Sequence, residues 1–73
     1  MRRVQRQRET AGWTRFQLGA AAGIHPARVG QIENGRVIPP PDSVELRRLS
    51  QALQWRGSPA ALLAEVSTDG RND

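Results

Sequence analysis

Apolar and small side chains recur three or four positions apart in several short segments of this 73-residue chain, and glycine or proline separates one segment from the next. This spacing is the period of an α-helix and not the alternation of a strand. The clearest example is the segment 42–54, in which one face carries Leu46, Leu49, Ala52 and Leu53. The pattern predicts a compact all-α domain built from five short helices.

The first helix is expected over residues 1–11, with Gly12 as the residue that ends it. Helical spacing turns four of its positions inward: Val4, Gln7, Arg8 and Ala11. An arginine among inward positions must snorkel to water or find a carboxylate, because an unpaired charge away from water is costly. Glu33, on the flank of a later helix next to its buried side, is the candidate partner of Arg8.

Two short helices joined by a turn of about three residues are predicted within residues 14–35. Thr14 and Gln17 have the spacing of a capping box at the start of the first helix. Gly23 is expected to end that helix with a positive φ, and Pro26 suits the first position of the next. Two helices with a glycine-bearing turn of this length describe a helix-turn-helix.

The first helix of this pair is expected to pack through Leu18, Ala21 and Ala22. Gly19 lowers helix propensity, and close approach by another helix is the expected compensation. Phe16 is expected either to cover the edge of the core or to lie on an exposed face.

The second helix of the pair, residues 26–34, has two different faces. Val29 and Ile32 share the face that is expected to be buried. The opposite face is small and polar, and it includes Ala27 and Gln31. Small residues allow a helix to enter a groove deeply, and a glutamine can hydrogen-bond the edge of a base. This face favours a position in a groove of DNA.

Residues 36–41, RVIPPP, are expected to form a stiff, extended connector. A ligand for a proline-recognition domain is the less favoured alternative, since such a segment between helices is more often a rigid loop. A fourth helix then spans 42–54, where Asp42 and Glu45 resemble a capping box, and Trp55 is expected to close the core.

A fifth helix is expected over about residues 59–66, begun by Ser58 and Pro59. The segment 67–73 has the composition of a disordered tail. The helix-turn-helix domain is therefore expected to span residues 1–66.

The chain has no cysteine and a single histidine, so we expect no metal site and no cofactor. It contains no nucleophile–base pair and no phosphate-binding loop, and a helix-cap role explains His25. We therefore expect no enzyme and assign no catalytic residue. No apolar run is long enough to span a membrane and no targeting signal is found, which predicts a cytoplasmic protein.

Positive charge is concentrated in the half that contains the helix pair. Residues 1–36 hold seven arginines and two glutamates, a balance of +5, whereas residues 37–73 hold four arginines and five acids, a balance of −1. All of this basic charge is arginine, whose planar fork suits phosphate and guanine. The distribution fits a polyanionic partner or a solubilising surface, and charge alone does not choose between them.

Together these features resemble the XRE family, the Cro and phage-repressor class of helix-turn-helix domains. The residues that carry the resemblance are Arg8, Gly12-Trp13-Thr14, Leu18-Gly19, Ala22-Gly23-Ile24, Ile32-Glu33-Asn34-Gly35-Arg36 and the segment LRRLSQAL at 46–53. The resemblance covers about residues 4–63. It implies a five-helix fold that binds operator DNA as a homodimer, with the third helix in the major groove.

The resemblance also implies roles for individual residues. Its base-facing positions are Pro26, Ala27, Arg28 and Gln31. Its phosphate-facing positions are Arg15, Asn34 and Arg36. Arg8 and Glu33 match the internal ion pair of the family. The chain departs from the family pattern at four positions, where Gln7, Arg15, His25 and Pro26 replace the usual residue types.

The leading hypothesis is a repressor-like transcriptional regulator that binds double-stranded DNA in a sequence-specific way and is associated with the nucleoid. The alternative is a protein-interaction module on the same fold, an antitoxin or an adaptor, in which a protein partner is primary and DNA binding is weak. Pro26 favours the alternative slightly, because it removes a polar side chain from a base-reading position. The dependence of DNA binding on salt distinguishes the two hypotheses.

Overall fold

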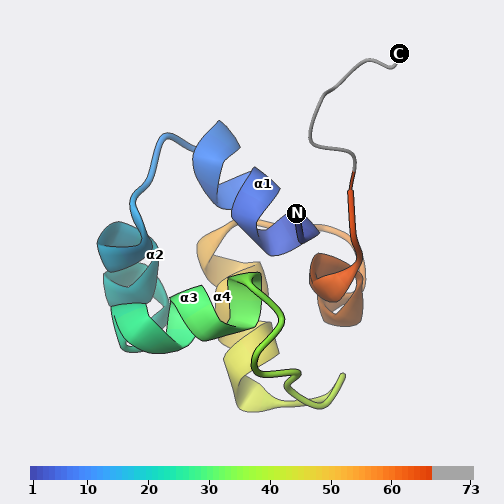
Figure 1. Ribbon diagram of the computed structural model, residues 1–73. Coiled ribbons are helices and arrows are strands. Elements are labelled where there is room, and N and C mark those ends of the chain that lie inside the picture. The colour runs from blue at the N-terminus through green and yellow to red at the C-terminus, as the bar shows by residue number, and fades with distance from the viewer. Residues whose placement is uncertain (67–73) are drawn as a thin grey trace.

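A computed structural model describes residues 1–66 of the chain, which fold as a set of packed helices (Figure 1). The elements are α1 (Arg3–Thr10), α2 (Arg15–Ala22), α3 (Pro26–Glu33), α4 (Val44–Ala52) and the 3-10 helix η1 (Pro59–Leu63). The only β pairing among the described residues is a single bridge between Arg2 and Glu65. The prediction of a compact all-α domain is confirmed. The expected disordered tail, 67–73, lies outside the described residues.

Local capping interactions set the bounds of α2 and α3. The Thr14 side chain accepts a hydrogen bond from the Gln17 amide, and the Gln17 side chain accepts one from the Thr14 amide. Gly23 ends α2 in the left-handed conformation at φ 72°, which glycine adopts without steric cost. His25 Nδ1 accepts a hydrogen bond from the Ala27 amide at 3.0 Å and caps α3. The predicted capping box and the predicted turn are therefore both confirmed.

The turn between α2 and α3 lies directly against α2. A Cβ atom on Gly19 would overlap the carbonyl oxygen of Ile24 and lie 3.3 Å from the backbone nitrogen of Pro26. The close approach expected at Gly19 is present, and the backbone of the turn makes it together with the first residue of α3. A larger residue at this position would push the turn away and change the angle between α2 and α3.

The core lies where α2, α3 and α4 meet, and α1 and η1 close it on the remaining side (Figure 1). Eight apolar side chains are buried there: Val4, Leu18, Ala22, Val29, Ile32, Leu46, Leu49 and Leu62. Each fully buried leucine stabilises the fold by about 1.5–3 kcal/mol relative to an exposed one. Trp13, Leu53 and Trp55 pack against this cluster from its edge. The apolar stripe predicted for α4 is thus the part of the core that both α2 and η1 pack against.

The predicted fifth helix, over about residues 59–66, is present but shorter, and it is a 3-10 helix that ends at Leu63. A short 3-10 helix forms first, and Ala64 is then extended with ψ 146°. Its carbonyl oxygen accepts a hydrogen bond from Arg3 N at 2.8 Å, and Val66 N donates to Met1 O at 2.8 Å. These bonds to the other end of the chain replace those of a continuing helix. Arg2 beside them is extended with ψ 150°, and α1 begins at Arg3 and not at residue 1.

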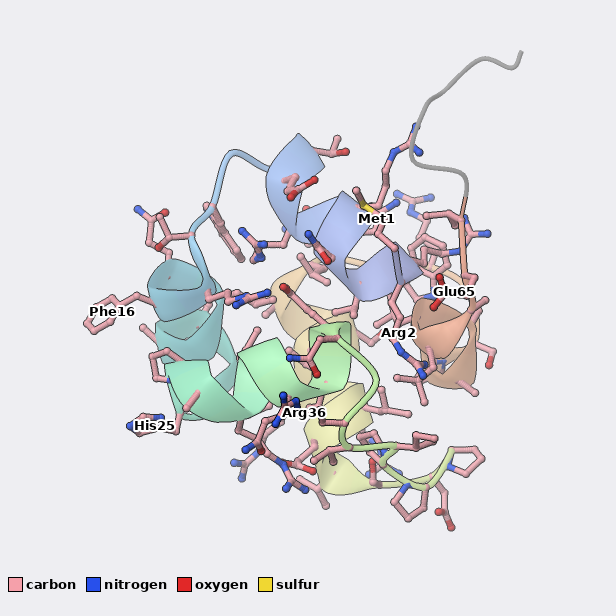
Figure 2. All side chains as sticks on the ribbon, in the orientation of Figure 1. Met1, Arg2, Phe16, His25, Arg36 and Glu65 are labelled. Atoms are coloured by element: carbon pink, nitrogen blue, oxygen red, sulfur yellow. The ribbon has the colours of Figure 1, made fainter. Side chains whose placement is uncertain are left out.

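Ala11 and Ala21 differ from the expected packing of α1 and α2. The position of Phe16 decides between the two alternatives that the sequence leaves open. Ala21 is exposed, because α2 faces the core through Leu18 and Ala22. Ala11 is exposed, because α1 ends at Thr10. The Phe16 side chain, whose place the sequence leaves open, is 71% exposed and projects away from α2 (Figure 2).

Candidate nucleic-acid interface

The outward face of α3 carries the small and polar surface that its sequence predicts. Ala27, Gln31 and Asn34 are exposed, and Pro26 at the first helical position is half-buried. Arg36 follows the helix and is also exposed, with its side chain beside α3 (Figure 2). These residues form an accessible surface that no other element of residues 1–66 covers.

Asn34 organises the turn that follows α3. Its side-chain oxygen Oδ1 accepts a hydrogen bond from the Arg36 amide at 3.1 Å. Gly35 between them has a φ of 84°, a conformation that favours glycine. The acceptor of Asn34 is therefore already used within the protein, and its NH2 group remains the part that can donate to a ligand.

One buried carboxylate joins α1, α2 and α3. The Glu33 side chain has no exposed surface, and it accepts hydrogen bonds from Arg8 Nε at 2.7 Å and Arg8 Nη2 at 3.2 Å. Arg15 Nε donates to the same carboxylate at 2.9 Å. The last nitrogen of Arg8, Nη1, donates to the carbonyl oxygen of Trp13 at 2.8 Å. The ion pair expected between Arg8 and Glu33 is present, and Arg15 joins it as a third member that the sequence does not predict.

Arg15 therefore combines an internal contact with an exposed end. Its side chain is 47% exposed, and only Nε takes part in the pair with Glu33. Among the described residues, the two terminal Nη groups of Arg15 have no hydrogen-bond partner. A guanidinium has five N–H donors, so most of its donors are available to an external anion.

Arg28 is engaged in a way that the sequence does not predict. Its Nε and Nη2 atoms donate to the two carboxylate oxygens of Glu45 at 2.7 and 2.8 Å. These hydrogen bonds hold the pKa of Glu45 below its usual value and raise the pKa of Arg28. The base-facing position expected for Arg28 is thus occupied by a guanidinium that already has a bidentate partner.

The partner of Arg28 comes from the first turn of α4, where the sequence suggests a different role for Glu45. Asp42 and Glu45 do not form the expected capping box, since Ser43 is the N-cap and its Oγ accepts a hydrogen bond from the Leu46 amide at 3.3 Å. The cap lies one residue later than expected, which frees the Glu45 side chain to reach α3. Only the crossing of α3 and α4 brings Glu45 to Arg28, so no local sequence signal could have found the pair.

The candidate site is an exposed surface and not a cavity, because residues 1–66 enclose no pocket. No cluster of three or more histidine, cysteine or acidic side chains in this range could hold a metal ion. In the same range, no helix has the length and the apolar character needed to cross a membrane. The chemistry of the surface is therefore that of hydrogen-bond donors, amides and fixed positive charge.

Residues 2–66 match the model of a protein family described as Helix-turn-helix domain. The match covers all five observed helical elements, including α1 and η1 outside the helix pair. No curated protein and no solved structure matches the chain.

Proposed function

The chain belongs to the helix-turn-helix domain family, and from this premise we propose that it is a repressor-like transcriptional regulator that reads double-stranded DNA. In this proposal α3 enters the major groove and α2 crosses the DNA backbone. Membership of this family supports DNA as the partner, and it supports binding as the function and not catalysis. The proposal includes membership of the XRE class and binding to operator DNA as a homodimer. It also places the protein in the cytoplasm, at the nucleoid.

The observation that carries the proposal is the outward face of α3. Gln31 and Ala27 are exposed on a helix whose angle to α2 is fixed by the tight turn at Gly19 and by the buried Glu33. A reading helix must be held rigidly, because hydrogen bonds to base edges depend on position and direction. The contacts of Gly19 and Glu33 support such a role, since they hold α3 against α2 and leave its outward face exposed.

The exposed side chains fit distinct roles in a DNA complex. Gln31 can make a bidentate pair with adenine, and Ala27 can contact a thymine methyl group. Arg36 and the NH2 group of Asn34 lie where they can donate to phosphate oxygens. Arg28 must leave or share Glu45 before it contacts DNA, so its role in base reading is smaller than its position alone suggests.

A selection of bound sequences from random duplex DNA, followed by titration of the selected site, tests the proposal. Gln31→Ala should lose about 1–3 kcal/mol of discrimination between the selected site and random DNA. Arg36→Ala should weaken binding to both by the same factor and reduce the salt slope by about 0.9. Absence of wild-type binding to any duplex at low salt would overturn the proposal.

A protein-interaction module, an antitoxin or an adaptor, is the second candidate. The exposed aromatic ring of Phe16 on α2 favours it, because phenylalanine is enriched in protein–protein interfaces relative to the rest of the surface. The Phe16→Ser variant distinguishes the candidates. If α3 reads DNA, the affinity for DNA should be unchanged. If Phe16 contacts a protein partner, the variant should no longer bind that partner.

A further inference from the structure

The side chain of Arg15 lies across Gly30, a residue inside α3. A Cβ atom on Gly30 would be 3.2 Å from Arg15 Nη1 and 3.4 Å from Arg15 Cζ. These separations are tighter than most Cβ contacts, so alanine at position 30 would displace the guanidinium by a few tenths of an ångström. Glycine inside a helix lowers helix stability relative to alanine. Glycine at position 30 therefore lowers the helix stability of α3 at the place where Arg15 crosses it.

Within residues 1–66, three arginines form ion pairs with carboxylates of α3 or α4, and they differ in how much of the guanidinium remains available. Arg8 uses all three of its nitrogens within the protein. Arg28 uses Nε and Nη2 for Glu45. Arg15 uses Nε alone, and it is the most exposed of the three at 47%. The internal contact thus fixes the direction of Arg15 without consuming its terminal donors.

The position of Gly30 on α3 determines where those donors lie. Gly30 is three residues from both Ala27 and Glu33, so it is separated from each by about 60° around the helix axis. Ala27 belongs to the exposed face and Glu33 to the buried one. Arg15 therefore runs from the buried carboxylate to the edge of the reading face, on the side of α3 that packs against α2.

We propose that Gly30 and Glu33 are positioning residues that aim Arg15 at a DNA phosphate beside the groove read by α3. Glu33 anchors Nε, and the missing side chain of Gly30 leaves room for the guanidinium next to α3. The rotamer entropy of the long side chain is then lost on folding and not on binding, which favours the contact. The inference rests on the proposed function, since it assigns a phosphate contact to that same interface.

The first measurement uses the free protein and does not depend on DNA. In the wild type, the Arg15 Nε–H resonance should be shifted and protected from solvent exchange by its bond to Glu33. The Gly30→Ala variant should lose part of that protection while its melting temperature stays the same or rises, because alanine favours the helix. An unchanged Arg15 resonance in Gly30→Ala would overturn the positioning role of Gly30.

The second measurement is a double-mutant cycle with random-sequence duplex DNA. Arg15→Ala should reduce the slope of log affinity against log salt by about 0.9, which is about a threefold change in relative affinity between 50 and 200 mM salt. Gly30→Ala should reduce the same slope by a smaller amount. In the Arg15→Ala background, Gly30→Ala should have no further effect, because its action passes through Arg15.

Arg56→Ala is the matched control, since it removes the same charge from the loop after α4. In the Arg56→Ala background, the coupling between Gly30→Ala and Arg15→Ala should be unchanged. Equal losses from Gly30→Ala with and without Arg15 would mean that alanine touches DNA directly, and the inference would be wrong. If the wild type binds no DNA while the Arg15 resonance behaves as expected, the proposed function fails and the internal geometry stands.

Discussion

The substitution Glu33→Gln keeps the shape of the side chain but removes the negative charge that Arg8 and Arg15 share. Glu33 is 2% exposed, and three guanidinium N–H groups point at its two oxygens. A glutamine would bring an NH2 donor against these donors and leave Arg8 without its counter-charge. Removing one partner of a buried ion pair destabilises a protein by about 3–5 kcal/mol.

The lower end of this range applies here. Arg8 is 11% exposed and Arg15 is 47% exposed, so both guanidinium groups can turn partly toward water when the charge is lost. A cost of about 3 kcal/mol is large for this domain, since 66 residues at roughly 0.05–0.15 kcal/mol each give a free energy of unfolding of about 3–10 kcal/mol. The melting temperature should fall by about 12–24 °C.

Urea and thermal unfolding, followed by circular dichroism and tryptophan fluorescence, measure this effect. Glu9→Gln is the matched control, because Glu9 lies on the exposed side of α1 with its carboxylate 3.9 Å from Arg8 Nη2. Its stability should stay within about 0.5 kcal/mol of the wild type. A loss below about 1 kcal/mol for Glu33→Gln would refute the reasoning, since the buried pair would then behave like a surface one.

Three further predictions concern Glu45 and His25. Arg28 lowers the pKa of Glu45, so their pair stabilises the fold above the ordinary value of 4.5 and the contribution is lost as pH falls through the lowered pKa. Glu45→Gln should therefore reduce the loss of stability in acid, measured by urea unfolding across pH, and a curve identical to wild type would contradict it. The same variant releases Arg28 and should tighten binding to random duplex DNA at low salt, measured by fluorescence anisotropy, whereas unchanged affinity would mean that Arg28 reaches no DNA. His25→Ala should lose about 0.5–2 kcal/mol of stability, and His25→Ser should retain it, because either an imidazole or a hydroxyl can cap α3. Equal stabilities of the His25→Ala variant and the wild type would argue against the cap.

Features that depend on a few neighbouring residues could be predicted from the sequence. The capping box of Thr14 and Gln17 and the left-handed Gly23 are local, and both are present. The pair of Arg8 and Glu33 is distant in sequence, yet it could be predicted because an inward arginine needs a carboxylate and Glu33 lies on the flank beside the buried face. Strong local rules and the requirement to neutralise a buried charge account for these successes.

Features that depend on the angle between helices could not be predicted. Residues 59–66 carry good helical spacing, but pairing of Ala64 and Val66 with the N-terminal residues prevails over local propensity. The contacts of Arg15 with Gly30 and of Arg28 with Glu45 each join two elements whose crossing the sequence does not define. These two contacts are the ones that change the interpretation of the candidate site.

The contact between Gly19 of α2 and the turn before α3 bears on how such a protein can diverge. The absence of a side chain at Gly19 and the buried Glu33 both constrain the angle between α2 and α3. The side chains of Ala27 and Gln31, on the outward face of α3, are exposed. Mutations at the outward positions can therefore alter what the surface recognises while the scaffold stays constant, so duplicated copies of such a gene could acquire new preferences without first losing their fold.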